Sequence, residues 1–172
     1  MYKRQAQIRE LAAALDLKPS KSLGQNFVID SNVCTKIVRT AEVGPTDIAL
    51  EIGPGLGSLT LALLDSAASV VAVEIDSRLA QQLPITVGNL FEHPENLTVL
   101  NQDALSIQSL PVNPTVLVAN LPYNVSVPVL LHLLEKFGSL RTGVVMVQAE
   151  VADRLAAKPG TCLLYTSPSP RD

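Results

Sequence analysis

The feature that most constrains the fold of this chain is a regular alternation of short apolar runs, rich in β-branched residues, with longer amphipathic stretches. Each apolar run is continuous, which is typical of strands buried on both faces of a parallel sheet. The predicted strands are Ile48–Ile52, Ser69–Glu74, Leu97–Asn101, Thr115–Asn120 and Gly143–Gln148. The alternation predicts an α/β fold built from right-handed βαβ units, in which ligands bind at the carboxyl ends of the strands.

The amphipathic stretches predict helices before, between and after these strands. Ser31 and Ser126 stand where helix N-caps are expected, and Pro128 falls in a first turn, which proline tolerates. The predicted helices are Gln7–Leu15, Ser31–Thr40, Ser58–Asp65, Arg78–Gln82, Val127–Phe137 and Glu150–Ala157.

The composition fits one globular domain, because 172 residues of which 47% are hydrophobic can bury a core. No run of about 18 apolar residues occurs and the first ten residues are polar and charged, so we expect no membrane span, no secretory signal and a cytoplasmic location. The two cysteines, Cys34 and Cys162, have neither a metal-binding spacing nor a disulfide framework. The net charge of −3 indicates that a basic surface for nucleic acid would come largely from residues outside this chain.

The first predicted strand runs into three glycines, Gly53, Gly55 and Gly57, just before the helix that Ser58 opens. Glycines at these positions let bare backbone approach a ligand at a helix N-terminus. Two residues before them stands Glu51, whose carboxylate would repel the pyrophosphate of a dinucleotide but attract the ammonium group of a methionine moiety. A nicotinamide-dinucleotide fold and a simple tight turn are the alternatives.

Two further carboxylates follow the next strands. Glu74 ends the second strand, 74 − 53 = 21 residues after Gly53, about the spacing at which a carboxylate reaches ribose hydroxyls. Asp103 follows the third strand, where its side chain could accept from an adenine amino group while the backbone at Ala104 meets the ring. The alternatives are a solvated strand-end carboxylate at Glu74 and a helix N-cap at Asp103.

The fourth strand ends in Asn120, Leu121, Pro122 and Tyr123, which suit chemistry on an exocyclic amine of a purine. Such an amine is a poor nucleophile because its lone pair is delocalised into the ring. The Asn120 side-chain carbonyl and a backbone carbonyl of Leu121 or Pro122 could hold both amine hydrogens and aim the lone pair at a methyl donor. Tyr123 offers a flat face for a base, and such stacking contributes about 1–3 kcal/mol. The alternative is a strand-ending turn with a packed aromatic ring.

Before the first strand, Asn26 and Phe27 lie in a segment that could close over the methionine end of a cofactor, although the sequence alone indicates only a loop. His93 and His132 have no partners in the sequence, so we expect ordinary surface or helix-packing roles and no metal site.

Together these motifs carry a family resemblance. In order and spacing, S-L-G-Q-N-F, E-I-G-P-G-L-G-S-L-T, V-E-I-D, Q-D-A and N-L-P-Y-N-V-S resemble the ribosomal RNA adenine dimethyltransferase family over about Lys18 to Pro159. The resemblance implies a Rossmann-like S-adenosylmethionine-dependent methyltransferase fold with a mostly parallel sheet, truncated after about the fifth strand. The cofactor contacts that it implies are Asn26, Phe27, Glu51, Gly53, Gly55, Gly57, Glu74, Asp103, Ala104 and Asn120. It also implies that Asn120 to Tyr123 face the target adenine.

The chain looks most like the bacterial small-subunit enzymes, a likeness that Asn124, Val125 and Ser126 favour. These enzymes transfer two methyl groups to the N6 amino group of each of two adjacent adenosines near the 3′ end of 16S ribosomal RNA. The implied partner is the small ribosomal subunit or its precursor, and the implied protein is a monomer that needs no metal. Two alternatives remain: a large-subunit methyltransferase that confers antibiotic resistance, and a catalytically idle RNA-binding assembly factor.

The two ends differ from the patterned sequence between them. From Cys162 to Asp172 the chain has no period, and its back-translation fits a transposon-end adapter used to fragment DNA. Tyr2 to Gln5 fits the reverse complement of the beginning of that adapter. We therefore expect residues 1–5 and 161–172 to be foreign, residues 6–160 to be an incomplete S-adenosylmethionine-binding catalytic domain, and the chain of this length to be inactive. The alternative is an ordinary flexible tail.

Overall fold

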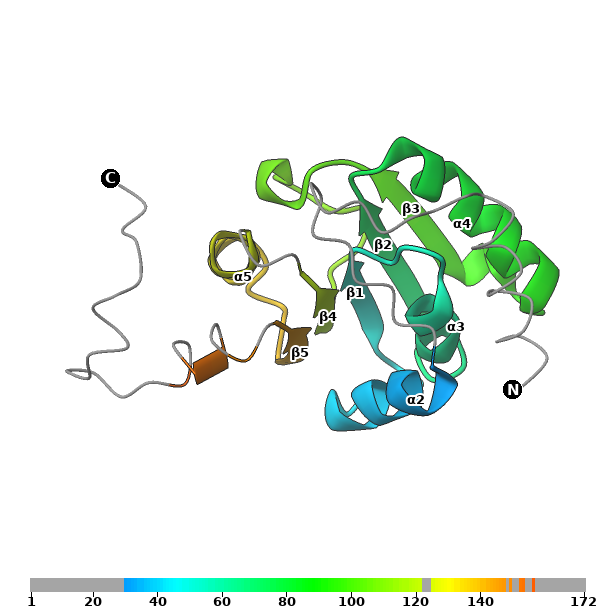
Figure 1. Ribbon diagram of the computed structural model, residues 1–172, viewed down its shortest axis with the longest axis horizontal. Coiled ribbons are helices and arrows are strands. Elements are labelled where there is room, and N and C mark those ends of the chain that lie inside the picture. Colours follow the sequence, from blue (N-terminus) through cyan, green and yellow to red (C-terminus); the bar gives the residue numbers. More distant parts are fainter. Residues whose placement is uncertain (1–29, 122–124, 148, 150–151, 154–155, 157–172) are drawn as a thin grey trace.

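A five-stranded sheet, in the order β3-β2-β1-β4-β5, forms the centre of the computed structural model (Figure 1). The structure describes residues 30–121, 125–147, 149, 152–153 and 156. All neighbouring strands are parallel, which confirms the predicted α/β fold. The strands are β1 (Ile48–Ile52), β2 (Ser69–Glu74), β3 (Leu97–Asn101), β4 (Val116–Asn120) and β5 (Thr142–Met146).

The register of the sheet aligns the carboxyl ends of its central strands. Ile52 at the end of β1 lies opposite Val73 of β2 and Ala119 of β4. The residues that follow these three positions therefore meet at one edge of the sheet, and all the predicted motifs of the described residues stand there.

Helices cover both faces of the sheet, and alternate strand residues pack against each side. The helices α2 (Ser31–Thr40), α3 (Ser58–Leu64) and α4 (Ser77–Leu90) pack on one face with Ala49, Val70 and Val116. On the opposite face, α5 (Ser126–Lys136) and the short 3-10 helix η3 (Ala104–Ser106) pack with Leu50, Val71 and Leu117. In Figure 1, α5 lies on the far side of the sheet from α2 and α3. None of the helices in the described ranges is long and apolar enough to cross a membrane.

The helix that follows β2 is longer than predicted. The prediction ended it at Gln82, but α4 continues to Leu90 through Pro84, a residue that removes a backbone donor from the helix. Leu79, Leu83 and Val87 are all buried at helical spacing. Their burial outweighs the local cost of the proline, so the shorter prediction was wrong.

The two predicted serine caps were also wrong. Asp30 caps α2, since its side chain accepts from the Asn32 amide at 2.8 Å, and Ser31 is the first helical residue. Ser126 is likewise the first residue of α5, after Val125 at the cap position. An aspartate one residue earlier satisfies the free helix amides as well as a serine does.

Other element bounds agree with the prediction within one or two residues, which is ordinary fraying at the ends. β4 begins at Val116 rather than Thr115, and β5 ends at Met146 rather than at Gln148, which is outside the described residues. The predicted helix Gln7–Leu15 and most of Glu150–Ala157 also lie outside them.

At the opposite, amino edge of the sheet, Asp47 ties three strands together. Its buried carboxylate accepts from the Thr115 hydroxyl at 2.7 Å, from the Arg141 guanidinium at 2.6 Å and from the Gly44 amide at 2.8 Å. The Arg141 hydrogen bond, helped by Thr115 and Gly44, lowers the pKa of Asp47 against the opposing effect of burial. Asp47 precedes β1, Thr115 precedes β4 and Arg141 precedes β5, so one charged group fixes the starts of all three strands.

Candidate functional site

The connection from β1 to α3 contains three glycines in a backbone conformation that other residues rarely adopt. Gly53, Gly55 and Gly57 have φ angles of +71°, +57° and +90°. The Gly53 amide donates to the Val73 carbonyl at 3.0 Å, so this glycine loop starts as an extension of the sheet. Gly57 then occupies the N-cap of α3 and leaves the first amides of that helix facing the strand ends.

A close approach explains why the first glycine cannot carry a side chain. A Cβ atom on Gly53 would lie 2.9 Å from the backbone oxygen of Asn120. The glycine loop therefore approaches the main chain at the end of β4 closely. This contact brings the predicted cofactor loop and the predicted amine-binding residue next to each other.

The carboxylate of Glu74 is buried, with 4% of its surface exposed, so the alternative of a solvated strand-end carboxylate is wrong. It accepts from the Gly55 amide at 3.1 Å and from the Asp76 amide at 3.0 Å. Burial raises the pKa of Glu74 despite these two hydrogen bonds. The residue thus links the end of β2 to the glycine loop, with its oxygens at the point where that loop passes.

The second carboxylate, Glu51, is 1% exposed and lies in β1 on the same side of the sheet as Glu74. Neither of its oxygens has a hydrogen-bond partner among the described residues. Burial raises the pKa of Glu51 to about 8, and the charge of Glu74 also raises it. The nearby Thr60 hydroxyl acts in the opposite direction, although it is too poorly placed to form a hydrogen bond with the carboxyl group. A buried carboxyl group with no partner is costly, and a bound cation would satisfy it.

Beyond β3, Asp103 acts as a helix N-cap, the alternative role that the sequence left open. Its side chain accepts from the Leu105 amide at 2.9 Å and caps η3, which confirms the N-cap. The side chain is exposed and Ala104 is buried beneath the turn. A contact with adenine at this position stays a prediction.

Two residues at this edge were missed by the sequence analysis. The Asn101 amide donates to the backbone carbonyls of Glu74 at 2.8 Å and Ile75 at 3.3 Å, so it holds the ends of β2 and β3 together. Ile75 is 56% exposed between two carboxylates, where an apolar side chain could pack against a flat ring. The sequence signal for it was an isoleucine between Glu74 and Asp76, directly after a buried strand.

At the end of β4, Asn120 is half-buried and pairs with Met146 of β5. Leu121 is buried, and its amide donates to the Met146 carbonyl at 3.3 Å. The structure thus brings Gly53, Glu74, Asn120 and Leu121 to one edge. Pro122, Tyr123, Asn26 and Phe27 lie outside the described residues.

The remaining candidate groups have structural partners. His93 contacts Glu95 at 3.1 Å on the surface, and the His132 ring lies 2.8 Å from the Ile107 carbonyl, so both have the ordinary roles that were predicted. Cys34 is buried in α2, and burial together with the charge of Glu51 raises the pKa of its thiol to about 11. Within the part of the chain that the structure describes, no three histidine, cysteine or acidic residues are placed to hold a metal ion.

Comparison with known proteins agrees with this geometry. The sequence profile of the family described as Ribosomal RNA adenine dimethylase matches residues 17–164. A Ribosomal RNA small subunit methyltransferase A from Leifsonia xyli subsp. xyli is 59% identical over 165 residues, which are 95% of this chain and 59% of that relative. The chain therefore spans about 59% of the length of this curated relative.

Two solved structures share the fold at substantial identity. The 23S rRNA methyltransferase ErmE is 33% identical with a TM-score of 0.66, over 75% of this chain and 50% of that one. A dimethyladenosine transferase from Plasmodium falciparum is 31% identical with a TM-score of 0.67, over 78% of this chain and 47% of that one. Sequence, fold and the arrangement of strand-end residues agree, and the chain belongs to the ribosomal RNA adenine dimethylase family.

Proposed function

We propose that this chain is the S-adenosylmethionine-binding part of an enzyme that dimethylates the N6 amino groups of two adjacent adenosines near the 3′ end of 16S ribosomal RNA. The observation that carries the proposal is the meeting of the glycine loop, two buried glutamates and Asn120 at one sheet edge. The carboxyl of Glu51, which has no hydrogen-bond partner in the described part of the chain, is the strongest sign that a cationic ligand belongs there.

The residues of this edge fit the proposed cofactor. Glu51 would bind the ammonium group, the glycine loop from Gly53 to Gly57 would face the methionine and ribose, and Glu74 would bind the ribose hydroxyls. Asp103 and the backbone at Ala104 would meet the adenine, and Asn26 and Phe27 would close over the methionine end. When bound, S-adenosylmethionine supplies an electrophilic methyl group on its sulfonium.

The chain's own contribution to the reaction is orientation. In our proposal the side-chain carbonyl of Asn120 and a backbone carbonyl of Leu121 or Pro122 accept the two hydrogens of the adenine amine. Tyr123 stacks on the base and holds it against this turn. Proximity and exclusion of water then account for most of the acceleration, with no covalent intermediate on the protein.

The choice of the small subunit rests on similarity. The relative at 59% identity is named for the small ribosomal subunit, whereas the large-subunit enzyme ErmE is 33% identical. The alternative of an idle binding factor is opposed by the presence of Glu51, Glu74, Asp103 and Asn120 together. We further propose a monomeric, cytoplasmic protein whose natural segment is residues 6–160.

The test is a chimaera in which residues 6–160 replace the matching part of the full-length Leifsonia xyli relative. With undermethylated small ribosomal subunits and labelled S-adenosylmethionine, the chimaera should incorporate methyl groups, and Asn120→Ala should abolish incorporation while preserving the fold. Asn113→Ala, an exposed asparagine in the connection before β4, is the matched control and should retain activity. Methylation at an unchanged rate by the Asn120 variant, or a preference of the protein for a nicotinamide dinucleotide, would refute the proposal.

A further inference from the structure

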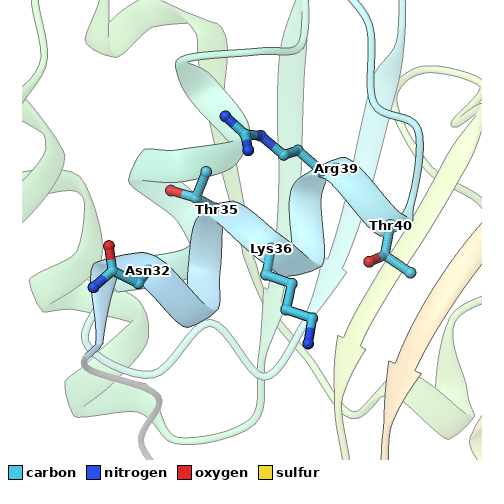
Figure 2. Close-up of a pocket in the computed structure, with 5 residues that line it drawn as sticks. All are labelled: Asn32, Thr35, Lys36, Arg39 and Thr40. Atoms are coloured by element: carbon cyan, nitrogen blue, oxygen red, sulfur yellow. The ribbon is translucent and has the colours of Figure 1, made fainter.

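The outer side of α2 carries an open groove that no part of the proposed reaction uses. The groove has a volume of about 590 Å³, opens to solvent, and is lined by Asn32, Thr35, Lys36, Arg39 and Thr40. Figure 2 shows all five side chains projecting from this one helix, with Lys36 and Arg39 extending to opposite sides of the ribbon in that view. The groove therefore presents two cations and three neutral hydrogen-bonding groups along an exposed helix.

The two cations of this groove differ from Arg78 and Arg141 in having no carboxylate partner among the described residues. Arg78 pairs with Asp76 at 3.2 Å and Arg141 pairs with Asp47 at 2.6 Å. Lys36 and Arg39 form no ion pair with the residues that the structure describes. Their positive charge is therefore available to an external anion, on a chain whose net charge is −3.

The position of α2 connects the groove to the candidate site. The helix packs against α3, which begins at the glycine loop, and its buried Cys34 lies close enough to Glu51 for the carboxylate to raise the pKa of the thiol. A ten-residue helix is about 15 Å long, which is long enough for an extended ligand to lie along its outer side.

Resting on the proposed function, we propose that the outer side of α2 binds the phosphate backbone of the substrate RNA. Lysine and arginine neutralise phosphates, while asparagine and threonine side chains contact phosphate and sugar oxygens without reading sequence. An open groove along a helix suits an extended polyanion, because a small anion would be held by an enclosed and buried site. The surface would position the RNA, and base selection would come from other residues.

The experiment measures RNA affinity of the 172-residue chain by fluorescence anisotropy over a range of salt concentrations. One probe is a hairpin with the 3′-terminal sequence of 16S ribosomal RNA, and the second is an unrelated hairpin of equal length. The double variant Lys36→Gln with Arg39→Gln should bind both hairpins on the order of tenfold more weakly, since each phosphate contact contributes about 0.7 to 0.9 to the slope of log affinity against log salt. That slope should fall by about 1.4 to 1.8 for two contacts.

Two further variants separate a docking surface from a general effect of charge. Lys136→Gln removes one positive charge from the last turn of α5, on the other face of the sheet, and should leave affinity unchanged. Lys36→Arg keeps the charge and should keep the affinity of the wild type. Circular dichroism of each variant verifies that the fold is retained.

Equal affinity and equal salt slope of the double variant and the wild type would overturn the docking surface, as would failure of the wild-type chain to bind either hairpin. A loss in the double variant that Lys136→Gln reproduces would overturn it too. The proposed function is judged separately, by calorimetric binding of S-adenosylmethionine to the same wild-type preparation. The two ideas can therefore fail independently.

Discussion

Replacing Glu51 by glutamine should change how the stability of the folded chain depends on pH. The wild-type carboxyl is buried without a hydrogen-bond partner among the described residues, and its pKa is raised from an ordinary value of 4.5 to about 8. Between these two values the folded state holds a proton that the unfolded state has released. The free energy of unfolding therefore falls as the pH rises from about 4.5 to about 8, and the stabilisation is fully present only below that window.

The size of the effect follows from the two pKa values. At 1.36 kcal/mol for each tenfold change, a rise from 4.5 to about 8 corresponds to at most about 5 kcal/mol. Glutamine has nearly the same shape and stays neutral at every pH. Glu51→Gln should therefore resemble the wild type near the lower end of the window and exceed its stability by up to several kcal/mol near the upper end, a large part of the roughly 5–15 kcal/mol typical of a domain.

The assay is urea unfolding followed by circular dichroism at several pH values across that window. Glu135→Gln removes an exposed carboxylate from α5 and should leave the pH dependence of the wild type unchanged. Glu74 also has a raised pKa and is present in both proteins, so it enters their difference only through its coupling to Glu51. A stability difference between Glu51→Gln and the wild type that stays constant over the window would show that Glu51 is already ionised in the folded chain, and the argument for a buried neutral carboxyl would fail.

Two other substitutions test the close approach of Gly53 to Asn120 and the hydrogen bonds of Asp47 at the amino edge of the sheet. Gly53→Ala should reduce S-adenosylmethionine affinity in calorimetry by roughly tenfold or more, because the φ of Gly53 is +71° and a Cβ atom there would lie 2.9 Å from the Asn120 oxygen. The control Gly88→Ala, in α4, meets no atom within 4 Å and should leave binding intact. Equal binding by both variants would contradict the close approach. Asp47→Ala should lower the free energy of unfolding at neutral pH by roughly 2–4 kcal/mol in urea titrations, because Arg141 and Thr115 lose their hydrogen-bond acceptor. Because the pKa of Asp47 is lowered, this loss should shrink as the pH falls below about 4, and Asp153→Ala, an exposed control, should show no loss at any pH.

The strands and their convergence could be predicted from the sequence because the information is local. Runs such as Ser69–Glu74 are continuously apolar, and parallel pairing then places every carboxyl end at one edge. The glycine loop was also predictable, since three glycines before a helix indicate backbone that must adopt positive φ. These features need no knowledge of what packs where.

The features that were missed depend on tertiary contacts. The continuation of α4 through Pro84 depends on burial of Leu83 and Val87 against the sheet, which a local rule about proline does not contain. The unpartnered state of Glu51 depends on which side chains surround it. The hydrogen bond from the Asn101 side chain to the Glu74 carbonyl depends on the end of β2 lying beside β3. In each case the residue is visible in the sequence, but its role is set by residues distant along the chain.

The contact of Gly53 with Asn120 has a consequence for how an enzyme built on this sheet can change over time. Because main-chain atoms of two hydrogen-bonded strands set the separation, no side-chain rotamer can lengthen or shorten it. The glycine loop and the end of β4 are thus held at a separation that belongs to the backbone of the sheet. Substitutions of the side chains around this edge can change the groups that face a ligand, while the separation of these two backbone segments stays constant.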